Sequence, residues 1–201
     1  MTRIGVFGSS FNPPTLGHSI LLAEARFTLG LDRVLVVPTG NPWHKDSRGA
    51  PRPELRLLLA EAAFGEIGWI EVSDIEVRRE GPSCTCDTLE EIQSTGIDRQ
   101  IFLLTGADAA LGFGDWHRPE RVLELARVAV APRSGVGRAE IESVFEKLDG
   151  VERLEFFAMP QVDISSTLVR ERIEAGGPWE HLVPHEAVEM IKNEDLYDRN
   201  Q

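Results

Sequence analysis

Residues 4–18 read I-G-V-F-G-S-S-F-N-P-P-T-L-G-H, and this stretch decides the fold. Its first four residues form a short apolar run, as in a buried strand, and Gly8 ends that run. Residues 18–29 follow with an apolar stripe at helical spacing. A strand, a glycine-bearing loop and a helix in this order are typical of an open parallel sheet that binds ligands beyond the carboxyl ends of its strands.

The same alternation continues along the chain. Further strands are predicted at 33–37, 69–77, 100–105, 127–131 and 153–157, and helices at 53–64, 87–93, 119–126, 140–148, 165–175 and 184–192. We expect an α/β fold with about five central strands, in a single doubly wound, mostly parallel sheet with helices on both faces, as in Rossmann-like proteins. No repeat or linker interrupts it, which predicts a single domain over 1–201 with a C-terminal helical portion from about 165.

Composition and charge narrow the functional classes. The chain has 201 residues, with 21 Lys plus Arg against 33 Asp plus Glu, for a formal net charge of −12. A nucleic-acid binder needs a basic surface, so we expect no nucleic-acid partner. No apolar run resembles a signal peptide or a membrane span, so we expect a cytoplasmic protein without a membrane partner. The sequence indicates no oligomeric state.

The two cysteines, Cys84 and Cys86, are separated by a single residue. A disulfide between residues so close would be strained, and two cysteines alone fall short of the four ligands of a structural zinc site. We therefore expect two reduced thiols and no metal site built by the protein itself.

The loop of residues 8–18 has the properties of a phosphate-binding segment. Gly8 and Gly17 allow a ligand to approach the backbone closely. His18 falls in the first turn of the predicted helix, where backbone N–H groups and the helix dipole favour an anion. The spacing matches neither a Walker loop nor a dinucleotide-binding glycine fingerprint. Hydroxyl donors come from Ser9, Ser10 and Thr15.

Two segments resemble the signatures of the nucleotidyltransferase superfamily. Residues 15–18, with their lead-in at 11–13, resemble the T/H-x-G-H motif, and residues 164–170 resemble I-S-S-T-x-x-R. Serine and threonine at a helix start are also ordinary N-caps. The resemblance implies that Ser166, Thr167 and the helix N-terminus hold the ATP β- and γ-phosphates, with Arg170 as a charged clamp.

Further segments resemble one branch of that superfamily, the nicotinate-nucleotide adenylyltransferases. They are P-W-H-K at 42–45, P-S-C-T-C-D-T-L at 82–89, and G-A-D at 106–108 followed by Trp116. The resemblance implies that Lys45 binds phosphate, Thr85 and Arg133 lie near the pyridine substituent, Asp108 contacts the ribose and Trp116 stacks on the pyridine. The structural alternatives are a solvated Lys45, a Thr85 and Asp87 that cap a helix, a core or rim Trp116 and a surface Arg133.

The implied reaction moves AMP from ATP to the phosphate of nicotinate mononucleotide, giving nicotinate adenine dinucleotide and pyrophosphate, with Mg²⁺ travelling with ATP. The acceptor phosphate is already anionic and needs no general base, so the site would act by positioning and charge stabilisation. The resemblance assigns three overlapping sets: catalytic His18, Thr15 and Lys45; ATP-binding Gly8, Ser9, Phe11, Gly17, His18, Gly106, Asp108, Ile164, Ser166, Thr167 and Arg170; and acceptor-binding Ser10, His44, Lys45, Thr85, Trp116 and Arg133.

Three positions depart from the family pattern. Thr15 stands where the pyridine-nucleotide enzymes usually have His, Asn12 where Asp is commoner, and Cys84 where Tyr is usual. The threonine form is shared with pantetheine-phosphate adenylyltransferases. Two alternatives therefore stay open: the same chemistry on nicotinamide mononucleotide or another phosphomonoester such as pantetheine phosphate, and a non-catalytic nucleotide-binding module.

Overall fold

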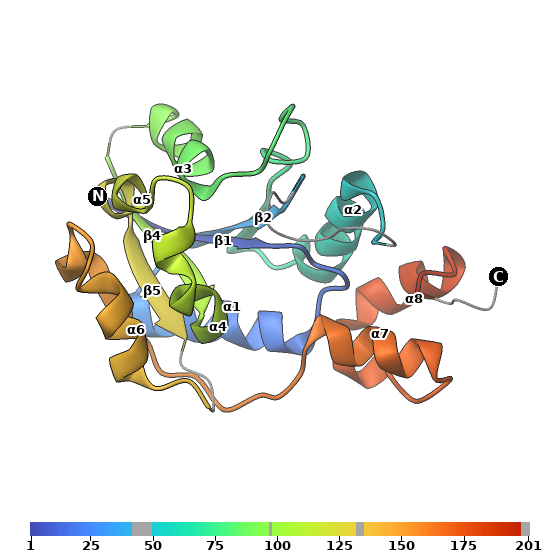
Figure 1. Cartoon of the computed structure of the whole chain (residues 1–201). Coiled ribbons are helices and arrows are strands. Elements are labelled where there is room, and N and C mark those ends of the chain that lie inside the picture. The colour runs from blue at the N-terminus through green and yellow to red at the C-terminus, as the bar shows by residue number, and fades with distance from the viewer. Residues whose placement is uncertain (42–49, 97, 132–134, 198–201) are drawn as a thin grey trace.

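A six-stranded parallel sheet forms the centre of the computed structural model, which describes residues 1–41, 50–96, 98–131 and 135–197 (Figure 1). The strand order is β3-β2-β1-β4-β5-β6, and every neighbouring pair is parallel. The strands are β1 (Thr2–Ser9), β2 (Arg33–Pro38), β3 (Ile70–Val72), β4 (Arg99–Gly106), β5 (Arg127–Ala131) and β6 (Leu154–Phe156). The expected fold class, a doubly wound parallel sheet, is confirmed.

Helices connect the strands and cover both faces of the sheet. They are α1 (Leu16–Leu29), α2 (Pro53–Phe64), α3 (Thr85–Ser94), α4 (Ala107–Leu111), α5 (Pro119–Leu125), α6 (Arg138–Phe145), α7 (Ser166–Glu174) and α8 (His185–Asn193). Short 3-10 turns lie at η1 (Phe113–Asp115), η2 (Val151–Arg153) and η3 (Glu180–Leu182). Figure 1 shows α3 and α5 along the upper side of the strands and α1 below them. None of the helices in the described ranges has the length and apolar character that a membrane crossing requires.

Alternating side chains of the strands separate two apolar cores. In β4, Phe102 and Leu104 pack with α1, α2 and α8, whereas Ile101 and Leu103 pack with α3, α4, α5 and α6. All four side chains are at most 3% exposed. Burial of both sheet faces explains why this strand reads as a continuous apolar run rather than an alternating one.

The structure corrects the expected elements in three respects. The sheet has six strands rather than about five, and the strand expected over 69–77 is only Ile70–Val72. Beyond it, Ser73 still donates to the Val36 carbonyl, but Arg78 donates to Asp74 and closes a turn instead of extending the ladder. The missed helix, α4, has five residues, which is too short to show a helical period.

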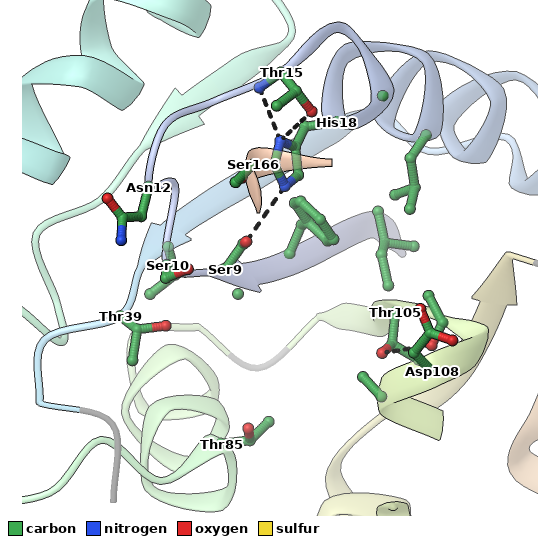
Figure 2. Close-up of a pocket in the computed structure, with 18 of the residues that line it drawn as sticks. Ser9, Ser10, Asn12, Thr15, His18, Thr39, Thr85, Thr105, Asp108 and Ser166 are labelled. Carbon is green, nitrogen blue, oxygen red and sulfur yellow. Dashed lines mark hydrogen bonds between the residues drawn. The ribbon is translucent and has the colours of Figure 1, made fainter. Parts of the chain in front are cut away.

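The direction in which successive strands are added to the sheet reverses between β1 and β4, and the site lies at this point. From β1 the chain runs onward to β2 on one side, whereas from β4 it runs to β5 on the other. The loops that leave β1 and β4 therefore diverge and open a crevice at the carboxyl ends of these strands. The loop of residues 8–18 and the start of α4 face each other across this crevice, as Figure 2 shows.

Candidate active site

A cavity of about 1400 Å³ occupies the crevice, which is large enough for two nucleotides. Its walls come from the ends of β1 and β4, the loop after β2, the start of α3 and the segment that leads into α7. Figure 2 shows Ser9, Thr15 and His18 on one wall, with Thr85 and Asp108 on the others. Most of the residues that the sequence motifs single out therefore line one space.

His18 is held as a neutral donor whose Nε2 faces Ser9. The Thr15 backbone N–H donates to His18 Nδ1 at 2.9 Å, so Nδ1 carries no proton and the ring proton belongs on Nε2. Nε2 lies 3.4 Å from Ser9 Oγ at the cavity wall (Figure 2). Burial lowers the pKa of His18 to about 4. The ring is therefore uncharged at neutral pH and offers an N–H, not a cation.

Thr15 supports His18 directly. Its side chain is 1% exposed, and Oγ1 lies 3.0 Å from His18 Nδ1. The family resemblance implies a catalytic role for Thr15, and in the structure its hydroxyl faces the histidine. Thr15 thus holds the His18 ring through both its backbone N–H and its side-chain hydroxyl. A threonine at position 15 can make these contacts, although the related enzymes usually have a histidine there.

Phe11 forms the floor beneath the histidine. Its ring is fully buried, 5.2 Å from the His18 ring and 5.6 Å from Phe64, measured between centroids. Its φ of 46° is in the left-handed region, which is unusual for a phenylalanine. We expected Phe11 to bind ATP, but its side chain packs in the core, so a contact with ligand would have to come from its backbone.

The two superfamily motifs are joined by direct hydrogen bonds. Ser166 Oγ donates to the Pro13 carbonyl at 2.7 Å, and Arg170 Nη1 donates to the Asn12 carbonyl at 2.6 Å. A second guanidinium nitrogen, Arg170 Nη2, donates to Thr167 Oγ1 at 3.2 Å. These contacts dock the N-terminus of α7 onto the loop of residues 8–18, so two helix N-termini point into the same cavity.

A close backbone approach completes this docking. A Cβ on Gly17 would lie 3.0 Å from the Ile164 carbonyl oxygen, so the glycine lets the two segments touch. Ser165 is the N-cap of α7 and accepts from the Leu168 backbone N–H at 3.1 Å. Ser165 therefore caps α7, and Ser166 and Thr167 lie in the first turn of the helix along the cavity wall.

The opposite walls carry the residues expected near the adenosine and the acceptor. Gly106 is the N-cap of α4 and places Asp108 in its first turn. Thr85 is the first residue of α3, whose N-cap is Cys84, so Thr85 does not itself cap the helix. Trp116 is partly buried, with its ring 5.0 Å from that of Phe113, and it lines the cavity. Three other candidates, His44, Lys45 and Arg133, lie outside the described residues.

Arg56 is the most buried cation of the cavity wall, and the sequence motifs did not identify it. It is 5% exposed and donates to three carbonyls: Ser10 at 2.9 Å, Gly40 at 3.0 Å and Pro51 at 3.2 Å. Burial lowers its pKa from the usual arginine value. Arg56 ties the loops after β1 and β2 to the start of α2, and the only sequence signal for it is a lone cation within the apolar helix 53–64.

Glu76 and Ser83 hold the loop after β2 from its other side. Ser83 Oγ accepts from the backbone N–H groups of Gly40 and Asn41, both at 3.1 Å, and Glu76 accepts from Thr88 Oγ1 at 2.8 Å. Burial raises the pKa of Glu76. A Cβ on Gly40 would lie 2.1 Å from the Glu76 carbonyl oxygen, so only glycine fits here. The cavity mouth is therefore fixed by buried polar contacts.

Proteins of similar sequence show the family to which the chain belongs. The family model described as cytidylyltransferase-like matches residues 6–172, which defines the chain as a nucleotidyltransferase of that class. Relatives named probable nicotinate-nucleotide adenylyltransferase are 36% identical in Dehalococcoides mccartyi, covering 98% of both chains, and 36% identical in Roseiflexus, covering 96% of this chain and 97% of the relative. The chain belongs to the nicotinate-nucleotide adenylyltransferase family.

A solved structure gives independent support for the fold. The Plasmodium falciparum nicotinic acid mononucleotide adenylyltransferase complexed with NaAD superposes with a TM-score of 0.82. It covers 100% of this chain and 99% of that one at 17% identity. At that identity the match concerns the arrangement of elements.

The neutral state of His18 predicts a pH dependence of folding. Because its folded pKa is about 4 against a usual 6.5, the unfolded chain takes up a proton that the folded chain does not, and stability falls as the pH drops through this window. Between pH 7 and pH 4.5 the wild type should lose about 2 kcal/mol more unfolding free energy than His18→Gln. Urea unfolding at both pH values measures this, and equal losses in the two proteins would contradict it.

Arg56 predicts a large loss of stability on substitution. Arg56→Met leaves three carbonyls without their donor, so the unfolding free energy should fall by about 3 kcal/mol. The matched control is Arg138→Met, which removes an exposed guanidinium on α6 paired with Glu142 and should change little. Chemical unfolding measures the unfolding free energy of both variants. Equal losses would show that the hydrogen bonds of Arg56 do not stabilise the fold.

Proposed function

We propose that this protein transfers AMP from ATP to nicotinate mononucleotide, forming nicotinate adenine dinucleotide and releasing pyrophosphate. The observation that carries the proposal is the docking of the two motifs, which aims two helix N-termini and the Nε2–H of His18 into one cavity. The choice of acceptor is supported by full-length relatives at 36% identity that bear the name of this activity.

The reaction requires one displacement at phosphorus. A phosphate oxygen of the acceptor attacks the α-phosphorus of ATP, a new P–O bond forms, and the bond to the β-phosphate oxygen breaks. The pyrophosphate leaves with the bonding electrons. The attacking oxygen is already ionised, so the protein's contribution is to align the reactants and to stabilise charge on the phosphoryl oxygens.

His18 would act on the α-phosphate through its Nε2–H. A neutral imidazole can donate this hydrogen bond without the desolvation cost of a buried cation. Thr15 positions the ring through Nδ1. Gly8, Ser9 and Gly17 bring the backbone of the loop close to the triphosphate, and Ser166, Thr167 and Arg170 hold its β- and γ-phosphates at the N-terminus of α7.

The rest of the cavity would divide between adenosine and acceptor. We assign Gly106, Asp108 and Ile164 to adenosine, because they line the wall beside the end of β4 and the entry to α7. The acceptor would lie between Ser10, Thr85 and Trp116. The proposal also keeps His44, Lys45 and Arg133 as acceptor-binding residues, on the basis of their sequence context alone.

Mg²⁺ would arrive with ATP. The carboxylates of the described cavity wall are those of Glu76, Asp108 and Asp115. Glu76 accepts a hydrogen bond from Thr88, and burial raises its pKa, which makes it a poor metal ligand. Phosphate oxygens and water would therefore supply most of the ligands, which is common for this ion.

Pyrophosphate release with three separate acceptors tests the proposal. The enzyme is supplied with ATP, Mg²⁺ and either nicotinate mononucleotide, nicotinamide mononucleotide or pantetheine phosphate. We expect kcat/KM with nicotinate mononucleotide to exceed the others by at least about tenfold, since a site built to pair with a carboxylate rejects an analogue that has an uncharged carboxamide or no pyridine in its place. His18→Ala, measured in parallel, should lower kcat by roughly 10²–10³ because a charge-stabilising donor is lost.

The other outcomes separate the alternatives. Preference for another acceptor would retain the adenylyl transfer and overturn the substrate. ATP binding without pyrophosphate release from any acceptor would identify a non-catalytic nucleotide-binding module. An unchanged kcat in His18→Ala would refute the role of the histidine.

A further inference from the structure

Three side chains of types that commonly ligate metals meet beside the cavity, two from adjacent residues and the third from a distant part of the chain. The Sγ of Cys86, a carboxylate oxygen of Asp87 and a ring nitrogen of His117 all lie within 4.8 Å of one another. Cys86 and Asp87 belong to the first turn of α3, whereas His117 lies between η1 and α5. Within the described ranges no other three histidine, cysteine or acidic side chains come together in this way.

The chemistry of the three groups selects a particular kind of ion. A thiolate is a soft ligand, an imidazole an intermediate one and a carboxylate a hard one, and Zn²⁺ accepts all three in tetrahedral sites. Mg²⁺ and Ca²⁺ prefer oxygen ligands alone. The set Cys, Asp and His therefore favours Zn²⁺ over the Mg²⁺ that accompanies ATP.

The three side chains differ in their exposure to solvent. Cys86 is fully buried, Asp87 is half-buried and His117 is exposed. Ligands of a tetrahedral Zn²⁺ are roughly 3.3–3.6 Å apart, as bond lengths of about 2.0–2.3 Å require. The exposed His117 ring can move inward by side-chain rotation to reach this spacing, whereas the cysteine is fixed by the core.

We propose that Cys86, Asp87 and His117 form a Zn²⁺ site with water as the fourth ligand. The Cys86 thiol donates to Asp87 Oδ1 at 3.4 Å, so its S–H already points at the second ligand. On binding, the S–H bond breaks, a Zn–S bond forms and the proton passes to solvent. The metal takes the place of that proton between sulfur and carboxylate.

The charged side chains near Asp87 can accommodate a bound cation. Arg118 Nη1 lies 3.8 Å from Asp87 Oδ1, which is a loose contact, and Nη2 of the same residue lies 3.1 Å from Glu90 Oε1. Glu90 also pairs with Arg121 at 2.7 Å. Arg118 is about half exposed, so it can release Asp87 and remain paired with Glu90 when a cation binds.

The site would link two walls of the cavity. Cys86 directly follows Thr85, and His117 directly follows Trp116. An ion held by all three ligands would fasten the start of α3 to the segment that carries the tryptophan. This link is a property of the protein without nucleotides, and its test does not depend on the proposed function.

Cobalt titration tests the site, because Co²⁺ substitutes for Zn²⁺ and a cobalt–thiolate bond absorbs in the near ultraviolet. The tag-free, reduced protein is titrated with CoCl₂ in the absence of ATP, and ZnCl₂ is then added in competition. We expect a saturable thiolate band with a stoichiometry of one, abolished by Zn²⁺. Cys86→Ser should remove the band, and Asp87→Asn and His117→Ala should each weaken binding at least about tenfold.

Two matched controls identify the ligands. Cys84→Ser alters the other buried thiol, and His185→Ala alters another exposed histidine, and both should bind Co²⁺ as the wild type does. Because Cys86→Ser could disturb folding, the exposed His117→Ala is the decisive variant. A thiolate band that His117→Ala leaves unchanged, that Cys84→Ser removes, or that never appears would overturn the proposal.

Discussion

Two backbone carbonyls, those of Asn12 and Pro13, determine how the site is assembled. They accept hydrogen bonds from Arg170 and Ser166, residues 158 and 153 positions further along the chain. Through these contacts the first turn of α7 lies beside the first turn of α1, and the positive ends of both helices meet in one cavity. The sheet brings the two segments to the same edge, but this contact sets the distance between them.

The same loop controls the charge of the site. His18 is neutral because burial lowers its pKa, so the positive potential comes from helix ends and from the guanidinium groups of Arg52, Arg56 and Arg170. Arg56 is bonded to carbonyls, and among the described residues no carboxylate forms an ion pair with it. Arg56 therefore places a buried positive charge at the cavity wall of a chain whose net charge is −12.

Local sequence was sufficient for the fold class and for most of the strands and helices, but not for the contacts between loops. Buried strands such as Arg127–Ala131 and the helix Pro53–Phe64 have patterns that depend only on neighbours in the chain, and both were predicted with the observed bounds. Arg56 and the contacts of Ser83 were not predicted because they involve the backbone of Gly40, which is distant in sequence. The cluster of Cys86, Asp87 and His117 was not predicted, because only the fold brings His117 close to the other two residues. The motif predicted a role for Thr15, but its contact with the His18 ring is visible only in the fold.

A double-mutant cycle between His18→Ala and Arg170→Gln shows whether the docked motifs act as one unit. The readout is kcat/KM for pyrophosphate release with nicotinate mononucleotide. If docking couples the two residues, the double variant should be at least about fivefold more active than the product of the single effects, a coupling of about 1 kcal/mol. Strictly multiplicative losses would mean that the two helix ends act independently, and would contradict the account.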